Sequence, residues 1–183
     1  MKNLFYTVIL CGVLLTGCNN EPNPFLIKKN NIGLLTDSTQ VKTLDAIFMN
    51  DSVVRYIAGD EFSGSVNTIE IYEKGGKKLL DLSPKEVLDS TSVIASVRII
   101  DSRYHTEKKI SILSTFKDIK EAYKISKIDN LINSIVVSVN DINASFTIDK
   151  KELPGSLRFD TNKIIDVLQI PEKAKIKYFM VHW

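Results

Sequence analysis

A stretch of alternating residues that folds back through a two-glycine turn constrains this chain most strongly. Residues 68–72 alternate between apolar and polar side chains, so Ile69 and Ile71 are expected to face a core. Residues 73–77 contain two adjacent glycines, which adopt positive φ at little cost and therefore predict a hairpin turn. Residues 78–82 then form the returning strand, and the hairpin predicts an antiparallel sheet.

Further strands are predicted in the second half of the chain. Residues 135–139 and 144–148 alternate on either side of a polar turn at 140–143, which indicates a second hairpin. Residues 93–100 form the longest β-branched run and are largely apolar on both faces, so we expect a central strand. Residues 174–183 close the chain as a strand.

Three segments have apolar residues at helical spacing after residues that commonly cap helices. The first follows the cap residues 36–39 and places Val41, Leu44 and Phe48 on one helical face. The second follows Ser114 and places Phe116, Ile119 and Tyr123 on one face. The third follows residues 160–161 and places Ile164, Ile165 and Leu168 inside. Other segments predict shorter elements: strands at 32–35, 53–57 and 110–113, and a helical turn at 83–86. The predicted fold is α+β, an antiparallel sheet with two or three helices packed on one face.

The order of these elements suggests an internal duplication. Residues 32–35 and 110–113 are each followed by a serine–threonine cap, a helix with the same apolar spacing, and an alternating hairpin. The alternative is that any α+β chain repeats such elements by chance.

The N-terminus has the features of a secretion signal. Lys2 is followed by an almost wholly apolar run at residues 4–15, which is shorter than the roughly 20 residues that a spanning helix needs. The run ends at Leu15-Thr16-Gly17-Cys18, and polar residues follow at once. An ordinary signal peptide cut elsewhere, or a buried N-terminal helix, is the alternative.

This tetrapeptide resembles a bacterial lipobox. The resemblance implies that residues 1–17 are removed as a lipoprotein signal peptide and that Cys18 carries a diacylglycerol thioether and an acylated amine. Two or three acyl chains on Cys18 would anchor the protein stably in a membrane, whereas a single acyl chain would not. By resemblance to known sorting rules, Asn19 favours the outer membrane, with the protein facing the periplasm or the cell surface.

The mature chain is expected to contain a flexible, proline-bearing tether at 18–31 and a single globular domain at 32–183. Cys11 leaves with the signal peptide and Cys18 is consumed by lipid, so no cysteine remains for a disulfide, a nucleophile or a metal ligand. The formal charge of the precursor is only +2, which excludes the basic footprint of a nucleic-acid binder.

Residues 93–123 resemble a group of uncharacterised lipoproteins from Gram-negative bacteria. In that pattern a strand leads to an aromatic residue and a threonine, here Tyr104 and Thr106, then to a turn and a Ser/Thr-capped helix that ends in a tyrosine. The family has a glycine in the turn where this chain has Lys109. The likeness extends loosely over 32–150, carries no catalytic residues and implies binding. Small periplasmic inhibitor and outer-membrane assembly lipoproteins, which contain tandem helix-plus-hairpin units, are more weakly similar.

The residues that carry chemistry are sparse. His105 and His182 are the two histidines, and neither belongs to a metal-binding motif. Residues 60–61 are an acid pair typical of a solvated loop, and the glycines at 75–76 fit a hairpin tip better than a phosphate loop. We therefore expect no catalytic residue, no metal and no cofactor, and we expect that the protein is not an enzyme.

Four aromatic residues are candidates for a binding surface on one side of the sheet: Tyr72, Tyr104, Tyr178 and Trp183. The alternative is that they pack against their neighbours. The sequence predicts a non-enzymatic, lipid-anchored envelope lipoprotein that binds a protein or envelope partner. A surface-exposed glycan- or peptide-binding module is the alternative, and a hydrolase with scattered acidic residues is a third. The Asp-Ser pairs at 37–38, 51–52 and 89–90 also resemble O-glycosylation acceptors, although such pairs are common at caps and turns.

Overall fold

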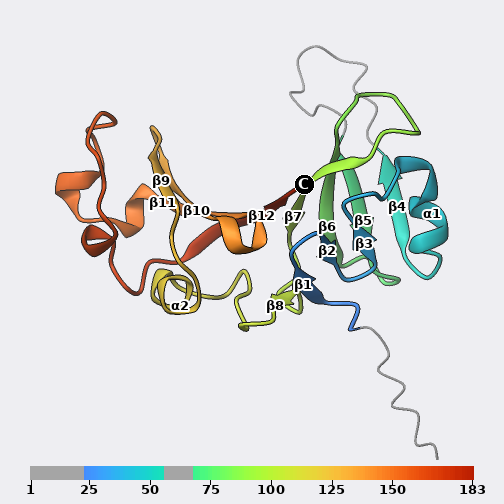
Figure 1. Ribbon diagram of the computed structural model, residues 1–183, viewed down its shortest axis with the longest axis horizontal. Coiled ribbons are helices and arrows are strands. Elements are labelled where there is room, and N and C mark those ends of the chain that lie inside the picture. Colours follow the sequence, from blue (N-terminus) through green and yellow to red (C-terminus); the bar gives the residue numbers. More distant parts are fainter. Residues whose placement is uncertain (1–22, 56–67) are drawn as a thin grey trace, which may run out of the picture.

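An eight-stranded antiparallel sheet extends through the molecule in this computed structural model, which describes residues 23–55 and 68–183 (Figure 1). Its strand order is β4-β5-β6-β7-β12-β11-β10-β9. In that order the strands are Ser52–Arg55, Ile69–Tyr72, Lys78–Pro84, Ile94–Ile99, Ile176–His182, Ala144–Asp149, Ser134–Val139 and Lys127–Asn130.

A smaller sheet is formed by the start of the described chain and one later strand, in the order β3-β2-β1-β8. These strands are Leu35–Thr36, Asn31–Ile32, Leu26–Lys28 and His105–Thr106. The β1–β8 pair is parallel and the other pairs of this sheet are antiparallel.

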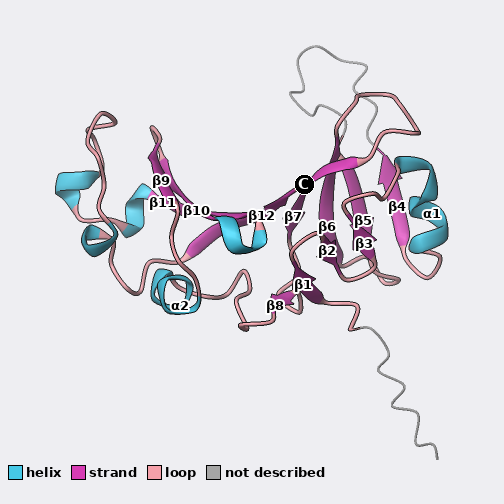
Figure 2. Cartoon of the chain, in the orientation of Figure 1, coloured by secondary structure: helices cyan, strands magenta, loops and turns pink. Residues whose placement is uncertain are grey.

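Helix is scarce in the described residues, as Figure 2 shows. The α-helices are α1 (Leu44–Ile47) and α2 (Phe116–Ala122). Short 3-10 turns are η1 (Val41–Thr43), η2 (Asn140–Ile142), η3 (Lys150–Glu152), η4 (Gly155–Leu157) and η5 (Val167–Gln169). None of the helices in the described part of the chain is long and apolar enough to cross a membrane.

One face of the large sheet is apolar over most of its width. Strand register aligns Leu80, Ile99, Phe179 and Phe146 across four neighbouring strands, and all four side chains are buried. The rings of Phe146 and Phe179 lie 4.6 Å apart. Buried residues of α2 and of the small sheet belong to the same core, and Figure 1 shows both elements on the same side of the large sheet.

The two hairpins and the central strand form as predicted. β5 and β6 bury Ile69 and Ile71, and their turn places Gly75 and Gly76 at φ 114° and 91°. β10 and β11 pair through a turn in which Asn143 adopts a left-handed conformation, with φ 48°. β7 is the fourth of eight strands. The mixed α+β class and its mainly antiparallel strands are therefore confirmed.

Each half of the large sheet follows the same order along the chain. A helix precedes four consecutive antiparallel strands, α1 before β4 to β7 and α2 before β9 to β12. The last strand of each half, β7 and β12, pairs with the other to join the halves. The large sheet is consequently continuous from one edge strand to the other.

The predicted tether and the predicted strand at 32–35 are wrong in part. The first sheet begins at Leu26, and Ile27 is fully buried, so the described segment 23–31 is structured. The chain then reverses in the turn between β2 and β3, where Gly33 adopts a left-handed conformation with φ 56°. A Cβ at Gly33 would lie 2.0 Å from the Pro24 carbonyl oxygen, so glycine is required there.

Three other predicted elements are absent from the described structure. Residues 83–84 continue β6 instead of starting a helical turn, and 110–113 form no strand. The third helix does not form, and Ile164 and Leu168 are exposed while Ile165 is buried. Asp160 and Asp166 accept hydrogen bonds from backbone amides two residues ahead, and such local bonds compete with helix.

Candidate functional site

The face of the large sheet opposite the core carries polar and aromatic side chains, and we call it the polar face. Register aligns Glu70, Asp81, Arg98 and Met180 across β5, β6, β7 and β12. The other members that matter below are Tyr72, Lys78, Tyr178, Ser145, Ser138 and His182, which occupy the same side of their strands. Most of these side chains are half-buried.

A charged network occupies the polar face over β5 to β7. Asp81 is only 4% exposed, and its carboxylate pairs with Lys78 (Nζ–Oδ1 2.7 Å) and with Arg98 (Nε–Oδ2 2.8 Å). Lys78 also donates to Glu70 at 2.5 Å, and the Tyr72 hydroxyl donates to the same carboxylate. Burial alone would lower the pKa of Lys78, but hydrogen bonds to Asp81 and Glu70 outweigh it and raise that pKa. Lys78 therefore stays charged between the two carboxylates.

The exposed end of this network is an arginine–tyrosine pair. The Arg98 guanidinium lies 5.5 Å from the centre of the Tyr178 ring, and the Lys177 ammonium lies at the same distance from it. The side chain of Arg98 is 38% exposed and Tyr178 is 39% exposed. Because Asp81 fixes the guanidinium from beneath, the pair presents a largely preorganised surface.

A cavity of about 350 Å³ lies at one end of the central strands, and we call it the terminal pocket. Its lining residues come from β10, β11, their turn and the end of β12: Ser138, Val139, Asn140, Asn143, Ala144, Ser145, His182 and Trp183. His182 Nε2 and Ser145 Oγ are hydrogen-bonded at 2.8 Å, and burial lowers the pKa of His182. Trp183 donates its backbone N–H to Ala95, whereas its buried indole N–H has no acceptor among the described residues.

The four predicted aromatic residues do not share one surface. Tyr72 and Tyr178 lie on the polar face, and Trp183 lines the terminal pocket. The prediction for Tyr104 is wrong, because this side chain is 3% exposed and packs edge-on against Phe25 with ring centres 5.1 Å apart. Its neighbours in the sequence are polar, but the ring itself fills the core beside β1.

A buried acid beside Tyr104 organises the same loop. Asp101 accepts hydrogen bonds from Arg103 (Nη2–Oδ2 2.9 Å) and pairs with Lys77 (2.8 Å). Arg103 also makes a bidentate contact with Glu73, at 2.8 and 3.0 Å, and lies over the Phe25 ring. Burial alone would raise the pKa of Asp101, but the bonds from Arg103 and Lys77 outweigh it and set that pKa to about 2. This cluster links the hairpin turn to the small sheet and has a structural role.

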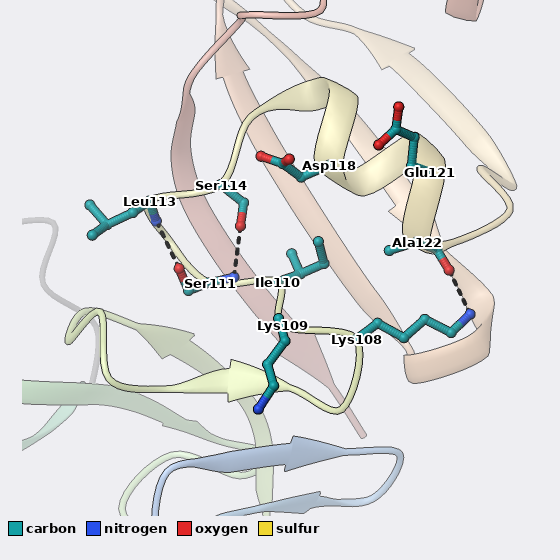
Figure 3. Close-up of a pocket in the computed structure, with 9 residues that line it drawn as sticks. All are labelled: Lys108, Lys109, Ile110, Ser111, Leu113, Ser114, Asp118, Glu121 and Ala122. Carbon is teal, nitrogen blue, oxygen red and sulfur yellow. Dashed lines mark hydrogen bonds between the residues drawn. The ribbon is translucent and has the colours of Figure 1, made fainter.

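A shallow groove beside α2 is lined by both charges (Figure 3). Lys108 donates to the Ala122 carbonyl at 2.5 Å and lies 4.5 Å from the centre of the Tyr123 ring, so its ammonium closes the end of the helix. Figure 3 shows Asp118 and Glu121 on the helix and Lys109 turned away from them. Because Lys108 already bonds the end of α2 and Asp118 already caps its start, the groove offers a weaker site than the polar face.

The remaining predicted residues contribute no site in the described structure. His105 bonds its own loop through Nδ1 and the Arg103 carbonyl at 2.8 Å. Across 23–55 and 68–183 there is no group of three or more His, Cys, Asp or Glu side chains placed to hold a metal ion. The lipobox with Cys18 and the acid pair at 60–61 lie outside the described residues.

Sequence reasoning missed Asp81, Arg98, Ser138 and Ser145. Asp81 interrupts an apolar strand, and the two serines alternate with buried residues of the second hairpin. Outward positions on an alternating strand were the available signal. Which of them come together depends on the pairing of β7 with β12, since these strands lie far apart in the chain.

Comparison with known proteins yields a likeness of fold. No family model matches the chain, and no curated protein matches it. Among solved structures, the chain resembles the crystal structure of the uncharacterized protein yfeY from Escherichia coli, with a TM-score of 0.53 and 12% sequence identity. The alignment covers 86% of this chain and 99% of that one, so the likeness extends over most of the fold.

Proposed function

We propose that this protein is a lipid-anchored lipoprotein of the cell envelope, with no catalytic activity, that binds a protein partner through the polar face. Cys18 is the proposed site of lipidation, with the outer membrane as the destination. The described chain begins beside β1, so the proposed tether would attach the small-sheet end of the molecule to the membrane (Figure 1).

The observation that carries the binding proposal is the Arg98–Tyr178 pair. Together with tryptophan, arginine and tyrosine are the residue types most enriched among the energetic anchors of protein interfaces. Here Asp81 holds the guanidinium beneath, and more than a third of each side chain stays exposed. Little conformational entropy is lost when a partner contacts such a pair, which favours binding.

The same paired halves favour an internal duplication as the origin of the large sheet. Each half has a helix before four consecutive strands, and the halves meet through their last strands. The charged network and Tyr178 lie on the neighbouring strands β5, β6, β7 and β12, so the proposed partner surface spans the junction of the two halves. A shared ancestry predicts that the two halves superimpose strand for strand after rotation about the β7–β12 pair.

Lipidation is tested by labelling cells with radioactive palmitate. The wild-type chain should incorporate label and sediment with outer membranes, whereas Cys18→Ser should lose both properties. Incorporation of label by Cys18→Ser would contradict the anchor.

Partner binding is tested by affinity capture of the tagged full chain from envelope extracts. Tyr178→Ala removes an exposed ring without disturbing Asp81, and Arg98→Ala removes the guanidinium. Both should lose, at least tenfold, any protein that the wild type retains above an anchor-only control. Lys117→Ala on α2 is the matched control, and equal loss in this variant would contradict the polar face.

A further inference from the structure

The terminal pocket contains many hydrogen-bonding groups but no charged side chain. Hydroxyls come from Ser138 and Ser145, and carboxamides come from Asn140 and Asn143. His182 completes the set, and burial lowers the pKa of its imidazole, which favours the uncharged form. An anionic or cationic ligand would lose its hydration without gaining an opposite charge, which is costly.

An apolar ligand is also disfavoured by this lining. It would displace water from the Ser138 hydroxyl and the asparagine carboxamides without offering them a hydrogen bond, at a cost of about 1–3 kcal/mol for each unsatisfied group in proteins. The pocket also contains the half-buried Trp183, whose indole ring supplies an apolar surface. The ligand that suits an aromatic ring and several neutral polar groups is uncharged and rich in hydroxyls.

The strands around the pocket argue against a peptide as the ligand. Peptides commonly bind a sheet by pairing with the backbone of a free edge strand. β10, β11 and β12 are each paired on both sides, so their backbone groups are already used. Recognition at this pocket has to come from side chains, as it does for a sugar.

We propose that the terminal pocket binds a neutral sugar residue of an envelope glycan. The inference rests on the proposed role as an envelope-binding protein and adds a second site, separate from the Arg98–Tyr178 pair. The volume of about 350 Å³ is at the low end of the range of about 300–1,000 Å³ found for small-ligand sites, which suits one small unit.

The pocket is held in shape before any ligand arrives. The Ser145–His182 bond of 2.8 Å joins β11 to β12, and the His182 backbone N–H donates to the Asn143 carbonyl at 2.8 Å. Asn143 itself closes the hairpin turn in the left-handed conformation. Because these residues are fixed by the fold, binding requires little reorganisation.

Trp183 is the only tryptophan of the chain, so its fluorescence reports on this pocket alone. The experiment titrates the full chain, in detergent, with neutral trisaccharides of glucose, galactose, mannose and N-acetylglucosamine, and with a trimer of glucuronic acid. At least one neutral sugar should change the emission saturably, and the anionic trimer should bind at least tenfold more weakly.

Variants locate the response. Ser145→Ala and His182→Ala should each weaken the sugar response about tenfold or more, because they remove pocket hydrogen bonds. Ser134→Ala, on the same face of β10 but outside the pocket lining, should bind as the wild type does. Circular dichroism checks that each variant is folded.

The proposal is overturned if no neutral sugar changes the emission, if the anionic trimer binds best, or if folded Ser145→Ala and His182→Ala respond as the wild type does. Failure of sugar binding can be distinguished from failure of protein binding at the polar face. Tyr178→Ala should keep the sugar response, and Asn140→Ala, in the turn that lines the pocket but outside the polar face, should keep any captured protein.

Discussion

Buried, paired carboxylates tie parts of this fold together. The described residues contain no cysteine, so no disulfide contributes to holding them. Asp101 and Asp81 are 2% and 4% exposed, and each is paired with one cation nearby in the sequence and one from another strand or turn. Removing one partner of such a cluster leaves a buried charge without compensation, which costs more than the intact pair contributes.

Asp101 should make the stability depend on pH. Its pKa is about 2 in the folded chain and 3.8 ordinarily, so folding favours the ionised form. The stabilisation, about 2 kcal/mol, is complete above pH 4 and is lost as the pH falls towards 2. We expect Asp101→Asn to lower the free energy of unfolding by about 2–3 kcal/mol at pH 7 in urea titrations.

The difference between Asp101→Asn and the wild type should shrink as the pH is lowered from 4 to 2. The exposed Glu121→Gln is the control and should change the free energy of unfolding by less than about 0.5 kcal/mol. A difference that stays constant down to pH 2 would contradict the assignment of the acid transition to Asp101.

Lys109 occupies a position where glycine is favoured. Its φ of 66° lies in the left-handed region, which costs an ordinary residue about 1–2 kcal/mol. Lys109→Gly should raise the free energy of unfolding by about 0.5–1 kcal/mol, after the greater freedom of glycine in the unfolded chain is subtracted.

Lys109→Ala serves as the control, because alanine retains the Cβ and therefore the strain. It should leave the urea midpoint close to that of the wild type. If Lys109→Gly is less stable than Lys109→Ala, the left-handed turn is not a source of strain.

At the scale of elements, the N-terminal end of α2 shows how hydrogen bonds of a few side chains determine where a helix begins. Thr115 and Asp118 form a reciprocal capping box, in which Asp118 accepts from the Thr115 backbone N–H at 2.7 Å. The sequence favoured Ser114 as the cap, one residue early. Ser114 instead accepts a hydrogen bond from the Ser111 backbone at 3.1 Å.

Thr115→Ala should therefore lower the free energy of unfolding by about 1 kcal/mol, the usual cost of losing an N-cap. Ser114→Ala removes a hydroxyl next to it and should cost less than half as much. Urea denaturation compares the two variants. A larger loss for Ser114→Ala would show that the helix begins where the sequence alone suggested.

In the segment 160–170, the apolar residues that were predicted to share one helical face differ in burial. Ile165 is 5% exposed and its neighbour Ile164 is 92% exposed. Ile165→Ala should cost about 2–4 kcal/mol, whereas Ile164→Ala should change stability by less than about 0.5 kcal/mol. Calorimetric melting curves measure both. Equal losses would indicate that the segment forms the predicted helix with both side chains inside.

At the scale of the whole molecule, local sequence patterns predicted hairpins well and long-range pairing poorly. Alternation identified β5, β6, β10 and β11, because turn and strand signals lie together in the chain. It did not reveal that β7 pairs with β12, or that β1 pairs with β8, since those partners are about 80 residues apart. The candidate site depends on those pairings, which explains why Trp183 was predicted and its serine neighbours were not.

In the proposed function, the polar face is the side of the molecule that contacts a partner. Its most direct test is photo-crosslinking in living cells, with a light-activated amino acid placed at position 178 and, for comparison, at position 117 on α2. We predict that position 178 forms a specific adduct, that Arg98→Ala abolishes it, and that position 117 forms none. Adducts at position 117 alone, or adducts at 178 that persist in folded Arg98→Ala, would contradict partner binding through the polar face.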